Sequence, residues 1–230
     1  MPRPYRHSVR GLNMETEILE RINRGIILRT GAYLTNDHFV LHSGRHAQEY
    51  IEKALATTEP AFTEGLGDVI AKHFAEQPID LVLTTGYGAS LLGHCVARAH
   101  PSRPRFIYAN KQRDGEGISQ VALPREFRQY FAGAPMVLLV EDILTTGETV
   151  KGLIDLVNSL GGRVVGIGML WRRSQRAKFK FPLFALVDRE FPTYAPKDCP
   201  MCRRGVPINR EFLSEASPPQ RSRQKAASAN

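Results

Sequence analysis

Two adjacent carboxylates, Glu141 and Asp142, directly follow a short apolar run in the sequence. The run covers residues 137–140 and reads Val-Leu-Leu-Val, a pattern typical of a strand that is buried on both faces. Such a strand would place the two acids at its carboxyl end, where adjacent negative charges repel each other unless a ligand or cation uses them. The pair therefore indicates a binding or catalytic site.

The residues after the acidic pair have the composition of a phosphate-binding turn. Residues 145–149 read Thr-Thr-Gly-Glu-Thr and lead into a predicted helix over residues 148–160. The first N–H groups of a helix lack intrahelical partners, and together with the helix dipole they favour a phosphate group. The loop has neither the glycine triplet of a dinucleotide-binding fold nor the Gly-Lys-Ser/Thr ending of a P-loop. Another class of phosphate binder is indicated.

Together, residues 137–149 closely resemble the phosphoribosyl pyrophosphate motif of the type I phosphoribosyltransferases. The resemblance implies that Glu141 and Asp142 hold the ribose hydroxyls and stabilise the cationic sugar in the transition state. It also implies that the loop binds the 5-phosphate through Thr145, Thr146, Gly147, Glu148 and Thr149. Many relatives have a small residue in place of Glu148, so we expect its side chain on the solvent side of the helix. The alternative is a purely structural acidic turn with a capping threonine.

A second stretch narrows the resemblance to orotate phosphoribosyltransferases. Their N-terminal region is similar to residues 31–53, which read Gly-Ala-Tyr-Leu-Thr-Asn-Asp-His-Phe-Val-Leu-His-Ser-Gly-Arg-His-Ala-Gln-Glu-Tyr-Ile-Glu-Lys. In that family a segment ending in Ser-Gly-Arg closes over the base, which implies that Arg45 binds the base. The resemblance covers about residues 17–175. It implies transfer of phosphoribosyl from phosphoribosyl pyrophosphate to orotate. It also implies a Mg²⁺ ion that bridges the diphosphate, for which the sequence offers no certain protein ligand.

The resemblance extends to the groups that would contact the diphosphate. Residues 84–89 occupy the place of the pyrophosphate loop, where Tyr87 matches a tyrosine and Gly88 stands where some members have a lysine. Lys111 resembles the loop lysine that neutralises the diphosphate, and Arg113 would assist it, since a highly charged leaving group needs cations around it. The alternative is that both are solvated surface charges. In the family this loop reaches into the neighbouring subunit, which implies a homodimer.

Arg173 is the second candidate for contact with the base. It follows a predicted strand over residues 164–170 and aligns with a base-pairing arginine of orotate enzymes, and its guanidinium suits a planar carboxylate. Arg172 replaces the acid that the family usually has, so an outward-facing basic cluster is the alternative. Two rival functions stay open beside transfer to orotate. One is the same transfer to another base, and the other is a phosphoribosyl pyrophosphate-sensing regulator that binds RNA.

The cysteines allow two interpretations. The three cysteines, Cys95, Cys199 and Cys202, are too few for a disulfide framework and fit a reducing compartment. Cys199 and Cys202 have the spacing of half a zinc site, but the sequence has no second cysteine pair. Some bacterial relatives of the orotate enzymes end in a similar Cys-Pro-x-Cys followed by Gly-x-Pro. A packed C-terminal hook is the favoured interpretation, and zinc is the alternative.

The elements that would position these residues alternate between strand and helix. A strand, a glycine loop and a helix follow one another at residues 81–99 and again at residues 137–160. This order predicts an α/β fold with a mostly parallel central sheet and helices on both faces. Both loops then lie at the carboxyl ends of the strands, where such sheets bind ligands. Three further segments have clear local patterns, with helical spacing at residues 15–30 and 60–75 and a polar, loop-like composition at residues 110–121.

These segments complete a type I phosphoribosyltransferase fold with a small N-terminal hood. The predicted order is a disordered extension (1–14), a helix and base-covering hood (15–60), a phosphoribosyltransferase core with a C-terminal hook (61–212) and a disordered basic tail (213–230).

The net charge of +8 is concentrated at the two ends of the chain. Residues 1–10 contribute +3 and residues 203–230 contribute +4, which leaves +1 for the body. A nucleic-acid-binding face would carry its charge on folded elements, so we do not expect nucleic-acid binding. The sequence has no apolar run of about 18 residues and no secretory h-region near its start. We therefore predict a cytoplasmic protein without a membrane segment.

Overall fold

The structure is a computed structural model, and it describes residues 30–41, 43–52, 54–113 and 119–211. The predicted N-terminal extension and basic tail lie outside the described residues, as does the helix predicted over residues 15–30 except for its last residue. The chain divides into two compact units. The described part of the first is residues 30–33, 51–52, 54–113 and 119–191, and that of the second is residues 34–41, 43–50 and 192–211.

The first unit is built on a six-stranded sheet in the order β10-β9-β8-β5-β6-β7. Its strands are β5 (Leu81–Thr85), β6 (Arg105–Arg113), β7 (Ser119–Ala122), β8 (Met136–Leu144), β9 (Arg163–Arg172) and β10 (Leu183–Asp188). Neighbouring strands are parallel, except that β7 runs antiparallel to β6. Every residue of β5 is buried, which explains why this strand shows no polar alternation in the sequence.

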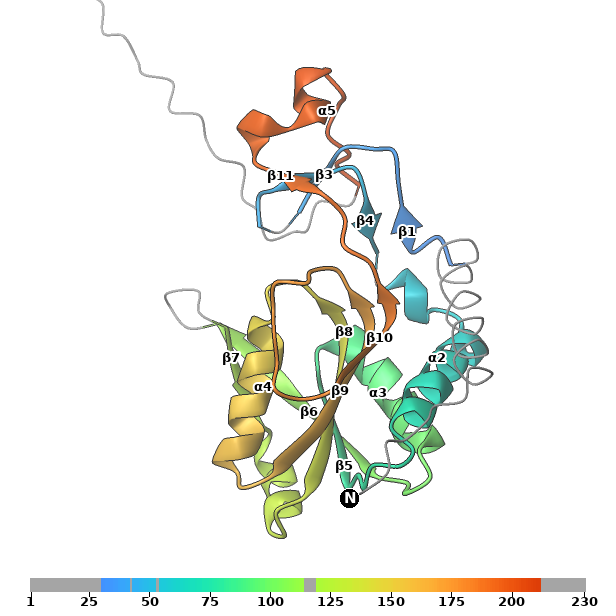
Figure 1. Cartoon of the computed structure of the whole chain (residues 1–230), viewed down its shortest axis with the longest axis vertical. Helices are drawn as coiled ribbons and strands as arrows, with labels where there is room; N and C mark the ends of the chain where they lie inside the picture. The colour runs from blue at the N-terminus through green and yellow to red at the C-terminus, as the bar shows by residue number, and fades with distance from the viewer. Residues whose placement is uncertain (1–29, 42, 53, 114–118, 212–230) are drawn as a thin grey trace, which may run out of the picture. The chain divides into compact units, whose positions relative to one another are not determined.

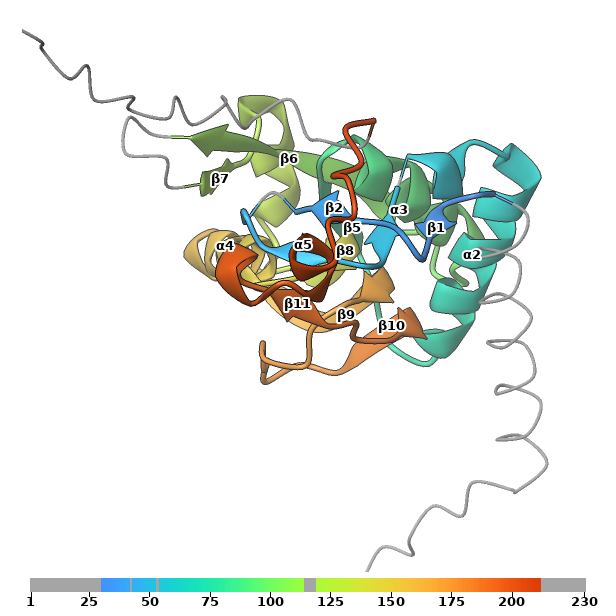
Figure 2. The ribbon, with the colours of Figure 1, turned by 90° about the horizontal axis from the view of Figure 1, so that it is seen from above.

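Helices cover both faces of this sheet. Figures 1 and 2 show α2 (Pro60–His73) and α3 (Tyr87–Ala99) on one face and α4 (Glu148–Ser159) on the other. Two 3₁₀ turns complete the unit, η1 (Leu55–Thr57) and η2 (Arg125–Phe131). The predicted fold class, a mostly parallel sheet between two helical layers, is confirmed. No helix in the described part of the chain is long and apolar enough to cross a bilayer.

Glycine sets the spacing of the two helices that share a face. A Cβ at Gly67 of α2 would lie 2.5 Å from the Cβ of Cys95 and 2.8 Å from its carbonyl carbon. Any side chain at residue 67 would therefore push α2 away from α3. This close contact fixes α3, whose first turn lies at the carboxyl edge of the sheet.

The segment predicted as a loop over residues 110–121 is largely a two-stranded arm. β6 continues to Arg113, and β7 pairs with it so that Asn110 faces Ala122 and Arg113 faces Ser119. The prediction was wrong for these residues because the polar composition reflects exposure and not the absence of a strand. Asn110 and Lys111 are exposed, and their backbone groups are satisfied by the neighbouring strand.

The second unit contains a three-stranded sheet in the order β11-β3-β2. Its elements are β2 (Phe39–Val40), β3 (His46–Ala47), β11 (Thr193–Tyr194), η3 (Pro196–Asp198) and α5 (Pro200–Arg203). β2 leads into a tight turn, in which Leu41 N–H donates to Arg45 O at 2.8 Å and Gly44 has a φ of +73°. A separate two-stranded sheet is formed by β1 (Tyr33–Leu34) and β4 (Tyr50–Ile51).

Candidate active site

The strand order of the first unit creates a switch point between β5 and β8. From β5 the chain passes through α3 to β6 on one side, whereas from β8 it passes through α4 to β9 on the other side. Open α/β sheets bind ligands outside the carboxyl ends of the strands at such a point. The two glycine loops singled out in the sequence follow β5 and β8, so both lie there.

The acidic pair belongs to β8 and is held by the backbone. Glu141 and Asp142 are only 2 % and 6 % exposed. Ile143 N–H donates to Asp142 Oδ1 at 2.7 Å, and Asp142 N–H donates to Glu141 Oε1 at 3.1 Å. The predicted strand ended at residue 140, but pairing with β9 continues to Leu144. The acids are therefore fixed in the rigid end of a strand.

Lys111 reaches the acidic pair from β6. Its Nζ lies 4.0 Å from Glu141 Oε2, and its side chain is 40 % exposed. An ion pair this long, with a partly exposed lysine, contributes little to stability. The ammonium can therefore turn to an anionic ligand at small cost. Arg113, the other predicted cation, is the last residue of the same strand.

The first turn of α3 approaches Asp142 very closely. Gly86, with a φ of +82°, precedes α3, which begins at Tyr87. A Cβ at Gly88 would lie only 3.0 Å from Asp142 Oδ2. A larger residue at position 88, such as the lysine of some relatives, would require the carboxylate to move. Tyr87 is 84 % exposed beside this contact.

Thr85 is a candidate site residue that the sequence prediction did not single out. It is the last residue of β5 and is 1 % exposed, and its hydroxyl has no hydrogen-bond partner within the described residues. A buried hydroxyl without a partner is costly, and an oxygen of a ligand at the carboxyl edge would satisfy it. In the sequence, the Thr84-Thr85 pair at the end of an otherwise apolar strand is the pattern that could have indicated this residue. Thr84 instead bonds Ser90 Oγ at 3.1 Å.

The predicted phosphate-binding turn leads into α4 as expected. Gly147 caps the helix with a left-handed φ of +84°, and a Cβ there would lie 2.7 Å from the Cβ of Ala177. Thr146 Oγ1 accepts a hydrogen bond from Glu148 N–H at 3.4 Å. Glu148 is exposed, which confirms the expected direction of its side chain, while Thr145 and Thr149 are half-buried. The turn therefore presents backbone and hydroxyl groups at a helix N-terminus.

Comparison with known proteins shows which family has this arrangement. The family described as phosphoribosyl transferase domain matches residues 56–188, which include the acidic pair, Lys111 and both glycine loops. The chain belongs to this phosphoribosyltransferase family. It is 35 % identical over 183 residues to an orotate phosphoribosyltransferase of Thermus thermophilus, covering 78 % of this chain and 94 % of that one. It is 34 % identical over 176 residues to the orotate phosphoribosyltransferase of Caldicellulosiruptor bescii, covering 76 % and 88 %.

Solved structures show the same fold. The orotate phosphoribosyltransferase of Mycobacterium tuberculosis H37Rv has a TM-score of 0.54 and 20 % identity, covering 75 % of this chain and 95 % of that one. The adenine phosphoribosyltransferase of Rhodothermus marinus has a TM-score of 0.56 and 17 % identity, covering 75 % and 98 %. The predicted type I phosphoribosyltransferase fold is therefore confirmed.

A phosphoribosyltransferase must also hold a base, and Arg173 is placed beside the end of β8. Its backbone N–H donates to Leu144 O at 3.0 Å, and its guanidinium lies over the ring of buried Phe191, 5.2 Å from the centroid. A cation–π contact of this kind orients the guanidinium. Arg172 pairs separately with Asp188, with Nη1 and Oδ2 3.4 Å apart.

Arg45, the other predicted base-binding residue, belongs to the second unit. Its Nε donates to Thr193 Oγ1 at 2.8 Å, and its Nη2 donates to Thr193 O at 2.5 Å. These bonds join the turn after β2 to β11. Contact between Arg45 and a base stays a prediction.

Proposed function

We propose that this phosphoribosyltransferase transfers the phosphoribosyl group from phosphoribosyl pyrophosphate to N1 of orotate, giving orotidine monophosphate and pyrophosphate. The observation that carries the proposal is the convergence of Asp142, Glu141 and Lys111 beside a helix N-terminus. The choice of base is supported by relatives at 31–35 % identity that are named orotate phosphoribosyltransferases.

In this reaction the bond between C1 of the ribose and a diphosphate oxygen breaks as a bond from C1 to N1 of orotate forms. N1 passes its proton to the departing diphosphate or to water, and positive charge develops on the sugar ring while the diphosphate leaves. Glu141 and Asp142 present carboxylates already fixed by backbone N–H groups, so stabilising this charge requires little reorganisation. Their burial strengthens the interaction because the local dielectric constant is low.

The phosphate groups are bound on either side of the sugar. We assign the 5-phosphate to the turn at Gly147 and the N-terminus of α4, with Thr145, Thr146 and Thr149 supplying hydroxyl groups. We assign the diphosphate to Lys111, Arg113, the first turn of α3 and the hydroxyl of Thr85. Glu148 is exposed, which keeps its charge away from the bound phosphate.

Magnesium fits the oxygen-rich edge of this site. Mg²⁺ is usually bound through one or two carboxylates together with the phosphates of a substrate. Glu141 and Asp142 are carboxylates of this kind, at the end of β8 where the diphosphate would lie. The ion would neutralise part of the charge of the diphosphate, and Lys111 and Arg113 would contribute positive charge from the protein.

The base is recognised by arginine. Orotate carries a planar carboxylate, which a guanidinium binds through two parallel hydrogen bonds. We assign this contact to Arg173, which Phe191 supports. On the family resemblance of the β6–β7 arm, we also propose a homodimer in the cytoplasm.

A panel of bases tests the proposed function. The full chain would be incubated with phosphoribosyl pyrophosphate, Mg²⁺ and orotate, uracil, adenine or hypoxanthine, and nucleotide and pyrophosphate would be quantified by chromatography. We expect equimolar products with orotate and none when Mg²⁺ is removed with a chelator. Turnover of another base without turnover of orotate would contradict the choice of base. Tight, salt-resistant RNA binding without any turnover would favour the regulator.

A further inference from the structure

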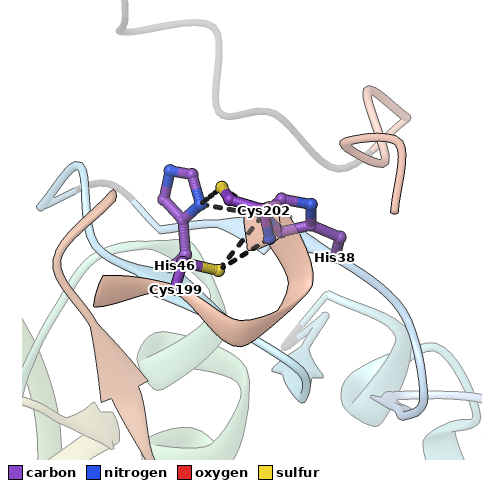
Figure 3. A group of neighbouring side chains, drawn as sticks. All are labelled: His38, His46, Cys199 and Cys202. Carbon is purple, nitrogen blue, oxygen red and sulfur yellow. Dashed lines mark hydrogen bonds between the residues drawn. The ribbon is translucent and has the colours of Figure 1, made fainter. Parts of the chain in front are cut away.

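The second unit contains four ligand-type side chains that the proposed reaction does not use. Figure 3 shows His38, His46, Cys199 and Cys202 pointing toward one another, and their ligand atoms all lie within 4.8 Å of one another. Cys202 is exposed and the other three residues are buried. Both cysteines are free thiols. The sequence suggested half a zinc site without a second cysteine pair, and the structure supplies two histidines in its place.

Three distances within the cluster are close to those of a tetrahedral metal site. With Zn–S near 2.3 Å and Zn–N near 2.0–2.1 Å, a sulfur and a nitrogen ligand stand about 3.6 Å apart. Cys199 Sγ and Cys202 Sγ each lie 3.6 Å from His38 Nε2, and Cys202 Sγ lies 3.3 Å from His46 Nδ1. The two histidine nitrogens are 2.8 Å apart, about 0.5 Å closer than the tetrahedral spacing. A small rotation of either ring would correct this difference.

Hydrogen bonds orient the ligands for a metal. His38 Nδ1 lies 2.7 Å from the carbonyl oxygen of Val206, which can only accept, so Nδ1 carries the proton and Nε2 presents its lone pair to the cluster. Cys202 N–H is directed at Cys199 Sγ at 3.5 Å, where it would stabilise a thiolate. The loop after α5 and the backbone within α5 thus hold two of the four ligands in place.

The surroundings shift the pKa values of two of the four groups, His46 and Cys202. Burial of its ring and then the neighbouring His38 lower the pKa of His46. Desolvation and the adjacent Cys199 raise the pKa of the Cys202 thiol. A divalent ion would displace the two thiol protons, and its charge would be balanced by the two thiolates.

We propose that His38, His46, Cys199 and Cys202 bind one Zn²⁺ ion as a structural site. The protein supplies all four ligands, which is typical of structural sites and leaves no open position for catalysis. Four ligand atoms within 4.8 Å surround one ion and leave no space for a two-iron cluster with bridging sulfides. In forming the site, two thiols release two protons as two Zn–S bonds form.

The metal would hold together a unit that is too small to build a large core. Units below about 70 residues rarely build a core that is sufficient alone, and many use metals, disulfides or association for stability. The proposed ion joins the β2–β3 hairpin to α5, and His38 and Cys199 are 161 residues apart in the sequence. The hairpin also contains Arg45, so the ion would fix the base of the turn that carries this arginine.

Metal content tests the proposal without any measurement of turnover. The untagged full chain would be purified under reducing conditions and analysed by inductively coupled plasma mass spectrometry, with Cys199→Ser/Cys202→Ser and His46→Ala as ligand variants. We expect one zinc per chain in the wild type and a loss of at least about 90 % of this zinc in the ligand variants. The double cysteine variant removes two of the four ligands, and His46→Ala removes one. Cys95→Ser and His94→Ala are matched controls outside the cluster and should retain one zinc.

A second measurement keeps the test decisive if a ligand variant does not fold. Wild-type protein would be stripped with a chelator and titrated with Zn²⁺ or Co²⁺. We expect saturation at one equivalent, release of about two protons and, with Co²⁺, the visible absorption of a tetrahedral sulfur–nitrogen site. No binding by the reduced wild type, or zinc retained by the double cysteine variant, would overturn the proposal. A Cys199–Cys202 disulfide in reductant-free protein that takes up no zinc would identify a redox pair instead.

Discussion

Replacement of Gly88 by alanine should impair catalysis at the acidic pair without lowering the stability of the fold. The new Cβ would stand 3.0 Å from Asp142 Oδ2 and 3.9 Å from Asp142 Cγ. The carboxylate must then shift by roughly a few tenths of an ångström from the orientation set by Ile143 N–H, since such a contact is too short to tolerate. Gly88 lies within α3, so alanine is compatible with the backbone there.

We expect Gly88→Ala to lose activity while it keeps its stability. A misplacement of about 1 Å at reacting groups can cost about 100-fold in rate, so a smaller shift should lower kcat/KM about tenfold, or about 1.4 kcal/mol. Alanine in a helix contributes about 0.5–1 kcal/mol relative to glycine, which offsets the strained contact. The melting temperature should therefore stay within about 3 °C of the wild-type value.

Gly65→Ala is the matched control for this experiment. Gly65 lies in α2, and a Cβ there would have no neighbour within 4 Å. The control should raise the melting temperature by about 2–4 °C and leave kcat/KM unchanged. Pyrophosphate release with orotate and thermal unfolding by circular dichroism give the two quantities. Wild-type kcat/KM in Gly88→Ala would refute the claim that the orientation of Asp142 limits the reaction.

Three further substitutions test other parts of the structure. Gly67→Ala should lower the free energy of unfolding by about 1–3 kcal/mol in urea, because its Cβ would stand 2.5 Å from that of Cys95. A urea midpoint at or above the wild-type value would contradict this packing. Lys111→Gln should lower kcat/KM about 10- to 100-fold, whereas the exposed control Lys72→Gln should leave kcat/KM unchanged. If the two variants had the same kcat/KM, Lys111 would lie outside the site. Thr85→Val should keep or raise the melting temperature, since the hydroxyl has no partner within the described residues. The same substitution should raise KM for phosphoribosyl pyrophosphate about 3- to 10-fold, because the bound substrate would lose a hydrogen bond. An unchanged KM would show that Thr85 does not contact this substrate.

The acidic pair and the phosphate-binding turn were predictable because all their determinants are contiguous. A buried strand, two acids, a glycine and a helix follow one another within residues 137–160, and local chemistry fixes each of them. The exact end of β8 was not predictable, because Leu144 remains in the strand through its pairing with β9. The close contact between Gly88 and Asp142 likewise depends on how α3 packs beside β8.

The second unit shows where local patterns fail. Its strands have two residues each, which is too short for a period of hydrophobicity to be visible. The pairing of Thr193 with Ala47 joins segments far apart in the chain, and no local signal predicts it. The spacing of Cys199 and Cys202 revealed half of the metal site. His38 and His46 were not recognisable as ligands, because their separation in the sequence matches no metal motif and only the hairpin brings them together.

The most direct test of the proposed chemistry compares orotidine monophosphate formation by the wild type, Asp142→Asn and Asp155→Asn with saturating substrates and Mg²⁺. Asparagine keeps the shape of Asp142 and an oxygen for Ile143 N–H, but it removes the negative charge that would face the cationic sugar. Asp155 is an exposed acid on α4 and serves as the control. We expect turnover to fall at least about 100-fold in Asp142→Asn, with an unchanged melting temperature, and to stay at the wild-type level in Asp155→Asn. Near-normal turnover by Asp142→Asn, or no turnover of orotate by the wild type, would contradict the proposed function.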